Sequence, residues 1–320
     1  MSTMRAVVMD APGAPEVLRV AEVPRPTRAS AEFIVKVCAA GVNPIDAKTR
    51  AGRGVSGAIS SWPSILGNDF SGVVVESPYD AHPIKVGDEV YGMSMVPRLP
   101  GTYAEFAAVP AMSIARKPKA LSHVEAAGVP LAALTAWGAV VDVARAREGQ
   151  RVLVHAGAGG VGHFAIQFAS FFGAHVVATG STRNLEWMRE LGANEVIDHT
   201  QTRFEDDMDP VDTVIDLIGN TVDDVGTRSL QVLKPGGLIV NLPSGSWPTL
   251  ADDAASAGVR ASGFSVSPDG TTLAVISRLI DSGDIRVFVD QVFDLADAAA
   301  AHAALEGGHT RGKIVLRVAD

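Results

Sequence analysis

A glycine-rich turn between an apolar strand and an apolar helix is the feature that most constrains the fold of this chain. Its members are Gly157, Ala158, Gly159, Gly160, Val161 and Gly162, which match the pattern G-x-G-x-x-G. The run RVLVHA (residues 151–156) precedes the turn, the helical run VGHFAIQFASFF (161–172) begins in it, and a second apolar strand, HVVATG (175–180), follows. This order of elements is typical of a dinucleotide-binding βαβ unit.

Each glycine of the turn has an expected role. We expect the first to allow a tight turn, the second to let backbone N–H groups approach a pyrophosphate, and the third to let the helix pack closely against the strand. The helix N-terminus adds unpaired N–H donors and a positive dipole end. The alternative, a plain glycine-rich turn without a ligand, explains the strand–helix–strand context less well.

The end of the second strand indicates which dinucleotide is bound. An NAD site usually places Asp or Glu there, to accept a hydrogen bond from the ribose 2′-OH. Here the chain reads TGSTRN over residues 179–184, and no carboxylate follows before Glu186. The hydroxyl of Ser181 and the guanidinium of Arg183 would bind a 2′-phosphate, so we predict NADPH as the cofactor. A solvated Arg183 at the start of the next helix is the alternative.

Composition excludes several other classes of protein. The 320 residues suggest about two domains. A net charge of −9 disfavours nucleic-acid binding. The single cysteine, Cys38, forms no internal disulfide and no cysteine-based zinc site, which fits a reducing compartment. We find no apolar run long enough for a membrane span and no signal-peptide pattern at the N-terminus, so we expect a cytoplasmic protein.

The hydrophobic pattern changes along the chain and predicts two domains. Up to about Leu121 the sequence reads as short β-strands separated by Gly and Pro, and a capping box at Ser122 and Glu125 then begins a helix. Strands and helices alternate from residue 151, which predicts a parallel α/β sheet covered on both faces. The tail, ending in the strand-like run Ile314–Val318, returns to mixed character. We therefore predict a discontinuous mostly-β domain (1–121 and 266–320) interrupted by a doubly wound domain (122–265).

Several motifs in one order extend the glycine turn to a family resemblance. They are AGVNPIDAK (40–48), LGNDFSG (66–72), VGDEV (86–90), LTAW (134–137), LGA (191–193) and GKIVL (312–316). With these, the chain resembles the zinc-independent medium-chain dehydrogenase/reductases, and specifically the quinone oxidoreductase (ζ-crystallin-like) branch. The resemblance implies an α/β fold, with a GroES-like catalytic domain and a Rossmann NADPH-binding domain, and a homodimer.

Zinc-dependent relatives carry a Cys and a Gly-His-Glu motif where this chain has Asn43 and Gly67-Asn68-Asp69. Because zinc favours thiolate and imidazole ligands, we expect no catalytic metal. The chain also departs from well-known quinone reductases, which bind the 2′-phosphate through a Lys at the position of Asn184 and a Tyr at that of His199. Arg183 is the expected substitute.

The resemblance implies hydride transfer from a nicotinamide to a quinone or an α,β-unsaturated carbonyl, whose product anion is delocalised. Asn43, Asp46 and Lys48 follow one strand end and are the predicted catalytic residues: Asn43 donating to substrate or ribose, Lys48 steadying the oxyanion, and Asp46 orienting Lys48 or the loop. The alternative is a structural turn, in which the Asn43 and Asp46 side chains bond local backbone.

The remaining predicted cofactor contacts lie at the nicotinamide end. They are Thr135, in the helix expected to cross the domain junction, and the strand-end residues Leu242, Ser244, Phe264 and Val266. A buried Thr135 that bonds its own helix is the alternative for that residue. His155 and His163 flank the glycine turn and read as structural, and Cys38 reads as a strand core residue.

Two other functions stay open. One is an enoyl-thioester reductase, which a wide acyl channel would distinguish. The other is a cofactor-binding structural or regulatory protein with little activity. In every case the expected partners are a small molecule and a second copy of the chain, paired through the sheet edge near residues 260–266. We expect neither nucleic acid nor membrane as a partner.

Overall fold

The computed structural model describes residues 2–96 and 101–319. The chain divides into two compact units, and the first of them is discontinuous: it contains residues 1–134 and 267–320, and the second contains residues 135–266. Sequence analysis placed the first boundary after Leu121. The structure instead assigns residues 122–134 to the first unit, because α2 (His123–Ala127) packs on strands of that unit.

The second unit is built on a six-stranded sheet in which every neighbouring pair is parallel. The spatial order is β11-β10-β9-β12-β13-β14, the doubly wound order of dinucleotide-binding domains. The strands are β9 (Arg151–Val154), β10 (His175–Gly180), β11 (Glu195–Asp198), β12 (Val211–Asp216), β13 (Leu233–Asn241) and β14 (Arg260–Gly263). The predicted Rossmann sheet is confirmed.

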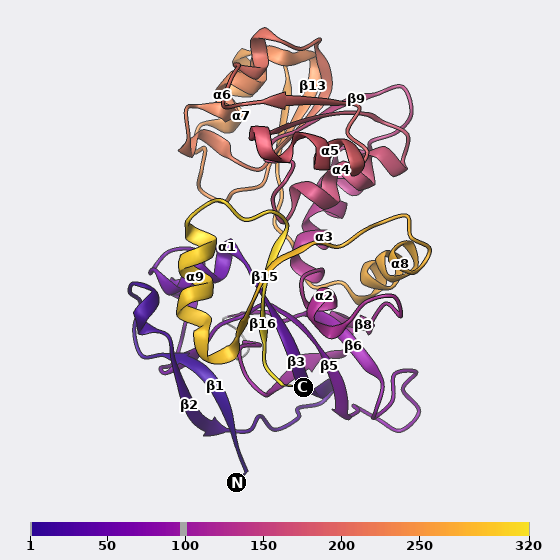
Figure 1. Ribbon diagram of the computed structural model, residues 1–320. Coiled ribbons are helices and arrows are strands. Elements are labelled where there is room, and N and C mark those ends of the chain that lie inside the picture. Colours follow the sequence, from indigo (N-terminus) through magenta and orange to yellow (C-terminus); the bar gives the residue numbers. More distant parts are fainter. Residues whose placement is uncertain (1, 97–100, 320) are drawn as a thin grey trace. The chain divides into compact units, whose positions relative to one another are not determined.

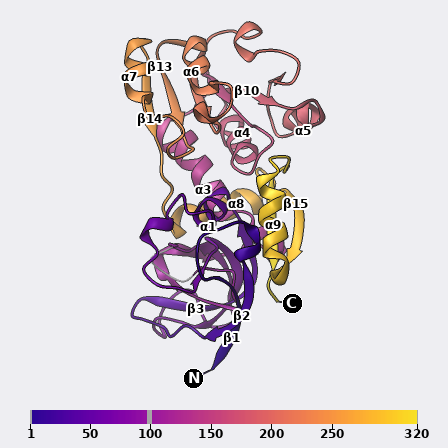
Figure 2. The ribbon, with the colours of Figure 1, turned by 90° about the vertical axis from the view of Figure 1, so that its left-hand side faces the viewer.

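Short helices connect these strands, as parallel pairing requires. They are α4 (Gly162–Phe171), α5 (Leu185–Glu190), α6 (Val225–Ser229) and α7 (Leu250–Ser256). Helix α4 packs on β9 and β10 and α5 on β11, whereas α6 contacts β13 and α7 contacts β14 (Figure 2). The strand interiors are continuous apolar runs because helices cover the sheet; Val152, Leu153 and Val154 of β9 are all fully buried.

The first unit is mostly β-structure. A seven-stranded sheet runs β15-β16-β3-β5-β6-β8, with β7 also paired to β3, and a three-stranded sheet runs β2-β1-β4. The strands are β1 (Thr3–Met9), β2 (Arg19–Pro24), β3 (Glu32–Val42), β4 (Ser64–Ile65), β5 (Asp69–Glu76), β6 (Glu89–Met93), β7 (Phe106–Pro110), β8 (Ile114–Arg116), β15 (Val289–Asp294) and β16 (Lys313–Arg317). Figure 1 shows the C-terminal β16 beside β3, so the tail rejoins this unit as expected.

The helices of the first unit are few. They are α1 (Pro44–Arg50), α2, α8 (Gly270–Asp281) and α9 (Ala298–Glu306), and α3 (Pro130–Trp137) runs across the boundary between the units in sequence. The predicted capping box begins α2: the Ser122 hydroxyl accepts from the Glu125 N–H, and the Glu125 carboxylate accepts from the Ser122 N–H. The helical stretch that this box begins is interrupted, since α2 ends at Ala127 and Gly138–Val143 is π-helical.

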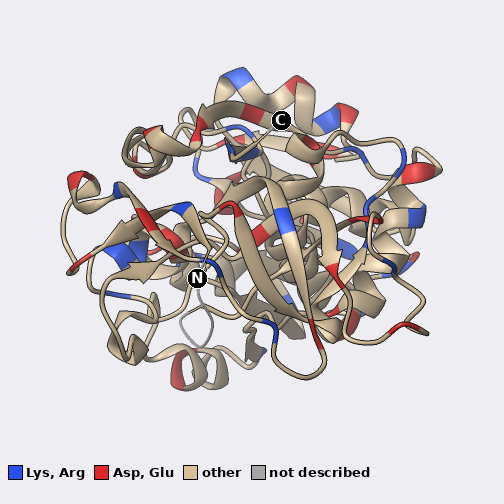
Figure 3. Ribbon diagram, turned by 90° about the horizontal axis from the view of Figure 1, so that it is seen from below, with Lys and Arg blue, Asp and Glu red and all other residues tan. Residues whose placement is uncertain are grey.

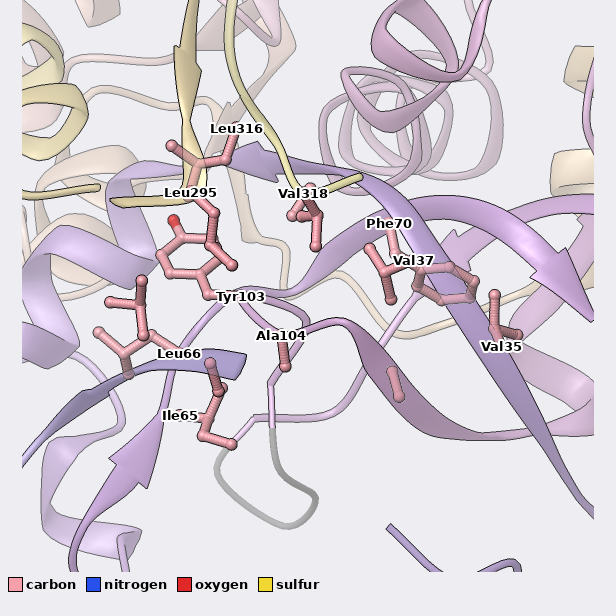
Figure 4. Packing of buried hydrophobic residues seen from close by; sticks show 14 of the residues in the cluster. Val35, Val37, Ile65, Leu66, Phe70, Tyr103, Ala104, Leu295, Leu316 and Val318 are labelled. Atoms are coloured by element: carbon pink, nitrogen blue, oxygen red, sulfur yellow. The ribbon is translucent and has the colours of Figure 1, made fainter. Parts of the chain in front are cut away.

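The core of the first unit joins both of its sequence segments. Figure 4 shows the Tyr103 ring close to Leu66 from the N-terminal segment and Leu295 from the tail. Leu316 and Val318 belong to the same cluster. Burial of these apolar side chains is therefore what holds the discontinuous unit together.

Acidic and basic residues are interspersed along the ribbon (Figure 3). Within the residues that the structure describes, no helix is long and apolar enough to cross a membrane.

Candidate cofactor and substrate site

The glycine turn connects the end of β9 to the start of α4. No hydrogen bond within the described residues engages the backbone N–H groups of Gly160 and Val161. Two unpaired donors at the N-terminus of a ten-residue helix form a ready site for an anion. The turn therefore has the geometry expected for a pyrophosphate site.

The tight turn is made by Ala156 rather than by the first glycine. Ala156 has φ +47°, in the left-handed region, whereas Gly157 does not have a positive φ. At Gly157 an added Cβ would lie 2.9 Å from both the Ile166 Cδ1 and the Met188 Sδ atoms, so those two side chains would have to shift. The expectation that the first glycine serves turn geometry is wrong, because the preceding alanine adopts the strained conformation.

The other two glycines differ in the space around them. An added Cβ at Gly162 would lie 2.2 Å from the Ala156 carbonyl oxygen and 2.8 Å from the Gly157 Cα, so the helix approaches the turn as closely as predicted. At Gly159 the nearest atom would be the same carbonyl oxygen, at 3.3 Å. Gly162 is thus a packing requirement, whereas Gly159 is crowded less severely and by one backbone atom.

The other predicted cofactor residues of the second unit follow its strands. Ser181 and Arg183 come directly after β10, and Leu242 follows β13, with Ser244 two residues later. Phe264 follows β14, and Val266 is the last residue of the unit. Because parallel strands end at the same edge, the structure brings these residues to the sheet edge that carries the glycine turn.

Two of these residues have further contacts. The Phe264 ring packs on Gly138, where an added Cβ would lie 2.0 Å from the ring. Ser181 accepts a hydrogen bond at 3.2 Å from the amide of Asn184. Thr135 lies in α3 and is buried.

A cavity of about 380 Å³ opens at the same carboxyl edge. Its lining includes Thr179 of β10, His199 after β11 and Ile218 after β12, together with Phe204 and Arg228. Arg228 does not offer a free charge to this cavity, since Glu205 and Asp223 both pair with it, at 2.6 and 2.5 Å. The cavity therefore combines polar side chains with the apolar side chains of Phe204 and Ile218.

His155 is a structural residue, as predicted. Its two ring nitrogens bond the hydroxyls of Thr179 (3.1 Å) and Ser229 (2.8 Å), and the ring packs edge-on against Phe204. Burial lowers the pKa of His155 to about 4, so the ring is neutral at pH 7. His163 is also buried, in α4, where Nδ1 lies 3.0 Å from the Gly159 carbonyl oxygen.

Sequence analysis missed a carboxylate beside the Ser181–Arg183 segment. Asp198 ends β11 and is the register partner of Gly180, the last residue of β10. One of its oxygens accepts from the Thr182 hydroxyl, and the other accepts from the N–H (2.9 Å) and hydroxyl (2.7 Å) of Thr200. The sequence did contain a signal for this carboxylate. Both strands were predicted, and adjacent parallel strands end at the same edge of a sheet.

In the first unit, Asn43 and Asp46 lie in a buried polar network at the start of α1. The Asp46 carboxylate accepts from the Asn43 N–H (2.9 Å), the Asn68 amide (2.7 Å) and the Tyr103 hydroxyl (3.3 Å). Asp46 is 1% exposed, and burial raises its pKa to about 7. Its contacts favour the structural-turn interpretation, since they cap α1 and tie it to neighbouring segments.

The Asn43 side chain is buried and bonds two residues that are far from it in the sequence. Its Nδ2 donates to Asp69 at 2.9 Å, and its Oδ1 accepts from the ammonium of Lys313, which also donates to the Val42 carbonyl at 3.2 Å. Lys313 and Asp69 form a buried ion pair at 3.7 Å. Burial raises the pKa of Asp69 and lowers that of Lys313, and the pairing of the two charges opposes both shifts.

Lys48 lies on α1 and is half-buried. Within the described residues, no hydrogen bond or ion pair engages its ammonium, and none connects it to Asp46. Lys48 is therefore the predicted catalytic residue whose charge remains available for a ligand.

The groups around Asn43 do not fit a zinc ion. They are amides, carboxylates and an ammonium, and the ammonium already supplies the positive charge beside Asp69. Zinc sites in proteins favour thiolate and imidazole. Among the described residues, no three His, Cys, Asp or Glu side chains converge to hold a metal.

Comparison with known proteins agrees with this geometry. Residues 29–119 match the alcohol dehydrogenase GroES-like domain family, and residues 191–316 match the zinc-binding dehydrogenase family. The NADPH-dependent alkenal/one oxidoreductase of Arabidopsis thaliana is 36% identical, over 89% of this chain and 72% of its own length. The NAD(P)H oxidoreductase RTN4IP1 of Danio rerio is 33% identical, over 90% of this chain and 84% of its own length.

A solved structure is similar over the whole chain. The quinone oxidoreductase of Coxiella burnetii is 38% identical, with a TM-score of 0.93, and the match covers 99% of this chain and 100% of that one. The similarity thus extends over both units of this chain and over the full length of that structure. The chain belongs to the quinone oxidoreductase branch of the medium-chain dehydrogenase/reductases.

Proposed function

We propose that this protein is an NADPH-dependent oxidoreductase that reduces quinones or α,β-unsaturated carbonyls by hydride transfer, without zinc. The observation that carries the proposal is the glycine turn with its unpaired N–H donors at the carboxyl edge of a doubly wound sheet. Similarity to an NADPH-dependent alkenal/one oxidoreductase and to a quinone oxidoreductase supports the acceptor class.

The residues that would hold the cofactor extend along one sheet edge. The backbone of Gly157, Gly159, Gly160, Val161 and Gly162 would hold the pyrophosphate. Ser181 and Arg183 would hold the 2′-phosphate, and Thr135, Leu242, Ser244, Phe264 and Val266 would contact the nicotinamide end. The cavity beside Thr179 and Ile218 would hold the adenine ring, with Phe204 and Ile218 as its apolar contacts.

Bound NADPH supplies the hydride, and the protein has to stabilise the oxyanion that forms on the acceptor. Lys48 is the cation that we assign to this oxyanion. Asn43 and Asp46 act as positioning residues: the first is held by Asp69 and Lys313, and the second caps the helix that carries Lys48. A conjugated acceptor spreads the developing charge, so hydrogen bonding and one ammonium suffice without a metal, and water supplies the proton.

A substrate panel tests the reaction class. The purified protein with NADPH should oxidise the cofactor in the presence of quinones and enals, monitored by the loss of reduced-nicotinamide absorbance. Saturated ketones should react more slowly at matched concentration, and the proposal fails if they react faster. A clear preference for crotonyl thioester would support the enoyl-thioester alternative. Metal analysis should find no stoichiometric zinc, and a chelator should leave activity unchanged.

Replacing Arg183 tests the cofactor assignment. A charge-assisted hydrogen bond contributes roughly 1.5–3 kcal/mol, so Arg183→Ala should weaken NADPH binding about 10- to 100-fold. NADH binding should barely change. Equal losses for both cofactors would show that Arg183 does not contact the 2′-phosphate.

Replacing Lys48 tests the assigned oxyanion contact. Lys48→Ala should lower kcat for an enone while NADPH affinity falls only modestly. If Lys48 only supports its helix, kcat and affinity should change little and Tm should fall instead.

The assembly and location of the protein are also proposals. We infer a cytoplasmic location. We also infer a homodimer, because the exposed edge strand β14 can pair with its copy across a two-fold axis. Light scattering on the eluted protein should give twice the monomer mass, and a strictly monomeric species would contradict the inference.

A further inference from the structure

The carboxylate of Asp198 lies where a 2′-phosphate would be least favoured. Gly180 and Asp198 are register partners at the carboxyl ends of β10 and β11, and Ser181, Thr182 and Arg183 follow Gly180 directly. Asp198 is hydrogen-bonded to the side chain of Thr182, within the segment proposed to hold the phosphate. The segment itself contains no carboxylate, but the pairing of β10 with β11 brings the carboxylate of Asp198 beside it.

The hydrogen bonds of Asp198 also determine what its neighbours can do. An ionised carboxylate only accepts, so the hydroxyls of Thr182 and Thr200 both donate to Asp198. Their oxygens can then accept a hydrogen bond but have no hydrogen left to donate. A ribose hydroxyl can donate to such an oxygen, whereas a phosphate dianion has no hydrogen to donate and needs donors around it.

We propose that Asp198 is a specificity-determining residue that reduces the preference for NADPH over NADH. It acts in two ways: by repelling the 2′-phosphate and by occupying the hydroxyl hydrogens of Thr182 and Thr200. The inference rests on the proposed function, since it concerns the same cofactor site. Hydrogen bonds from both threonines keep the pKa of Asp198 below its usual range, so the charge is present at neutral pH.

A group of the opposite sign lies on the same edge and explains why NADPH can still bind. This group is Arg183, which follows β10. The cofactor preference is therefore a balance between Arg183, which favours the 2′-phosphate, and Asp198, which opposes it. Removing Arg183 should lower the preference for NADPH, and removing Asp198 should raise it.

Binding of cofactor fragments isolates this effect from catalysis. Adenosine 2′,5′-bisphosphate and adenosine 5′-monophosphate differ only in the 2′-phosphate, and calorimetry gives the Kd of each. Asp198→Asn should strengthen binding of the bisphosphate about fivefold and leave the monophosphate nearly unchanged. Because the effect is electrostatic at an accessible site, it should shrink as salt is raised from about 0.05 to 0.5 M.

Two control variants separate charge from geometry. Asp198→Glu keeps the charge and should leave the preference close to that of the wild type. Asp207→Asn removes one negative charge from an exposed loop of the same unit and should change neither fragment's affinity appreciably. If Asp198→Asn does not fold, Asp198→Ser removes the same carboxylate with a smaller side chain.

The outcomes distinguish this inference from the function on which it rests. If the wild type binds neither the fragments nor the two cofactors, the proposed function fails. If it binds them and Asp198→Asn leaves the ratio of the two Kd values unchanged, the inference alone is overturned. Weaker bisphosphate binding in Asp198→Asn would also overturn it, because Asp198 would then be supporting the phosphate-binding segment.

Discussion

The two units bury carboxylates in different ways. In the first unit, Asp69 is fully buried and faces the ammonium of Lys313, which lies 3.7 Å away; it also accepts from the Asn43 amide (2.9 Å) and the Leu131 N–H (2.7 Å). In the second unit, Asp216 is equally buried, and within the described residues its hydrogen bonds come from neutral donors: the N–H groups of Ile218 (2.9 Å) and Gly219 (2.8 Å) and the amide of Asn241 (2.7 Å). Both carboxylates accept from neutral donors, and Asp69 additionally has a residue of opposite charge beside it.

The difference predicts which site is more easily damaged by one substitution. Losing Lys313 removes the opposite charge beside buried Asp69 and leaves that carboxylate with neutral donors, whereas losing one of the donors to Asp216 changes no charge. The following predictions test this contrast, beginning with the largest expected effect.

Lys313→Met should destabilise the protein by about 3–5 kcal/mol, the cost of breaking a buried ion pair from one side. Urea unfolding gives the free energy. The matched change in the second unit, Asn241→Ala, removes one donor from Asp216 and should cost about 2 kcal/mol. The double variant with Asp69→Asn should recover much of the Lys313→Met loss. Equal costs for Lys313→Met and Asn241→Ala would remove the contrast between the units.

Gly162→Ala should destabilise the protein by about 3 kcal/mol, at the upper end for overpacking, because the new methyl would meet the Ala156 carbonyl. At Gly159 the new methyl would lie 3.3 Å from the same oxygen, a milder contact, so Gly159→Ala should lose less stability than Gly162→Ala while losing dinucleotide affinity. Thermal unfolding and cofactor titration of both variants give the two quantities. Similar loss of stability in both would show that the turn is not packed as described.

The pH dependence of stability should reflect buried histidines in both units. His155 has a folded pKa of about 4 against an ordinary 6.5, so the stability it contributes is present above pH 6.5 and is lost as the pH falls towards 4. At pH 5 this loss is about 2 kcal/mol relative to pH 7. In the first unit, His302, whose pKa is also lowered to about 4, acts in the same direction.

Asp46 acts oppositely in the same pH range. Its pKa is raised from 3.8 to about 7, so the folded state takes up a proton first and gains relative stability as the pH falls from 7 to 4. Unfolding measured at pH 7 and pH 5 should therefore show a smaller acid-induced loss for His155→Gln and a larger one for Asp46→Asn. Parallel behaviour of the two variants would contradict these assignments.

Ser122→Ala is expected to have the smallest effect, about 1 kcal/mol, because it removes the capping box at an exposed helix start. Chemical denaturation at pH 7 would measure it. Ser122→Asp keeps an acceptor at the N-cap and should restore most of the lost stability. If Ser122→Ala cost as much stability as Lys313→Met, Ser122 would stabilise more than the start of α2.

Local features of the sequence were sufficient to predict much of the second unit. The alternation of apolar strands and helices with the glycine turn between them predicted the parallel sheet, since such runs are stable only when helices cover both faces. The capping box at Ser122 and the structural role of His155 were likewise predicted correctly. Short, partly exposed strands such as β2 and β15 were not predicted, because their apolar residues do not alternate clearly with polar ones.

The tertiary structure alone decided how residues far apart in the chain combine. Asn43 and Asp69 meet Lys313 only because β16 pairs with β3, and that pairing turned a predicted substrate contact into part of a buried network. Asp198 reaches the cofactor edge through the register of β10 and β11. Turns and caps depend on neighbours in sequence, so a sequence pattern can reveal them. The charge around a buried or binding group depends on every segment packed against it, and only the folded chain determines those segments.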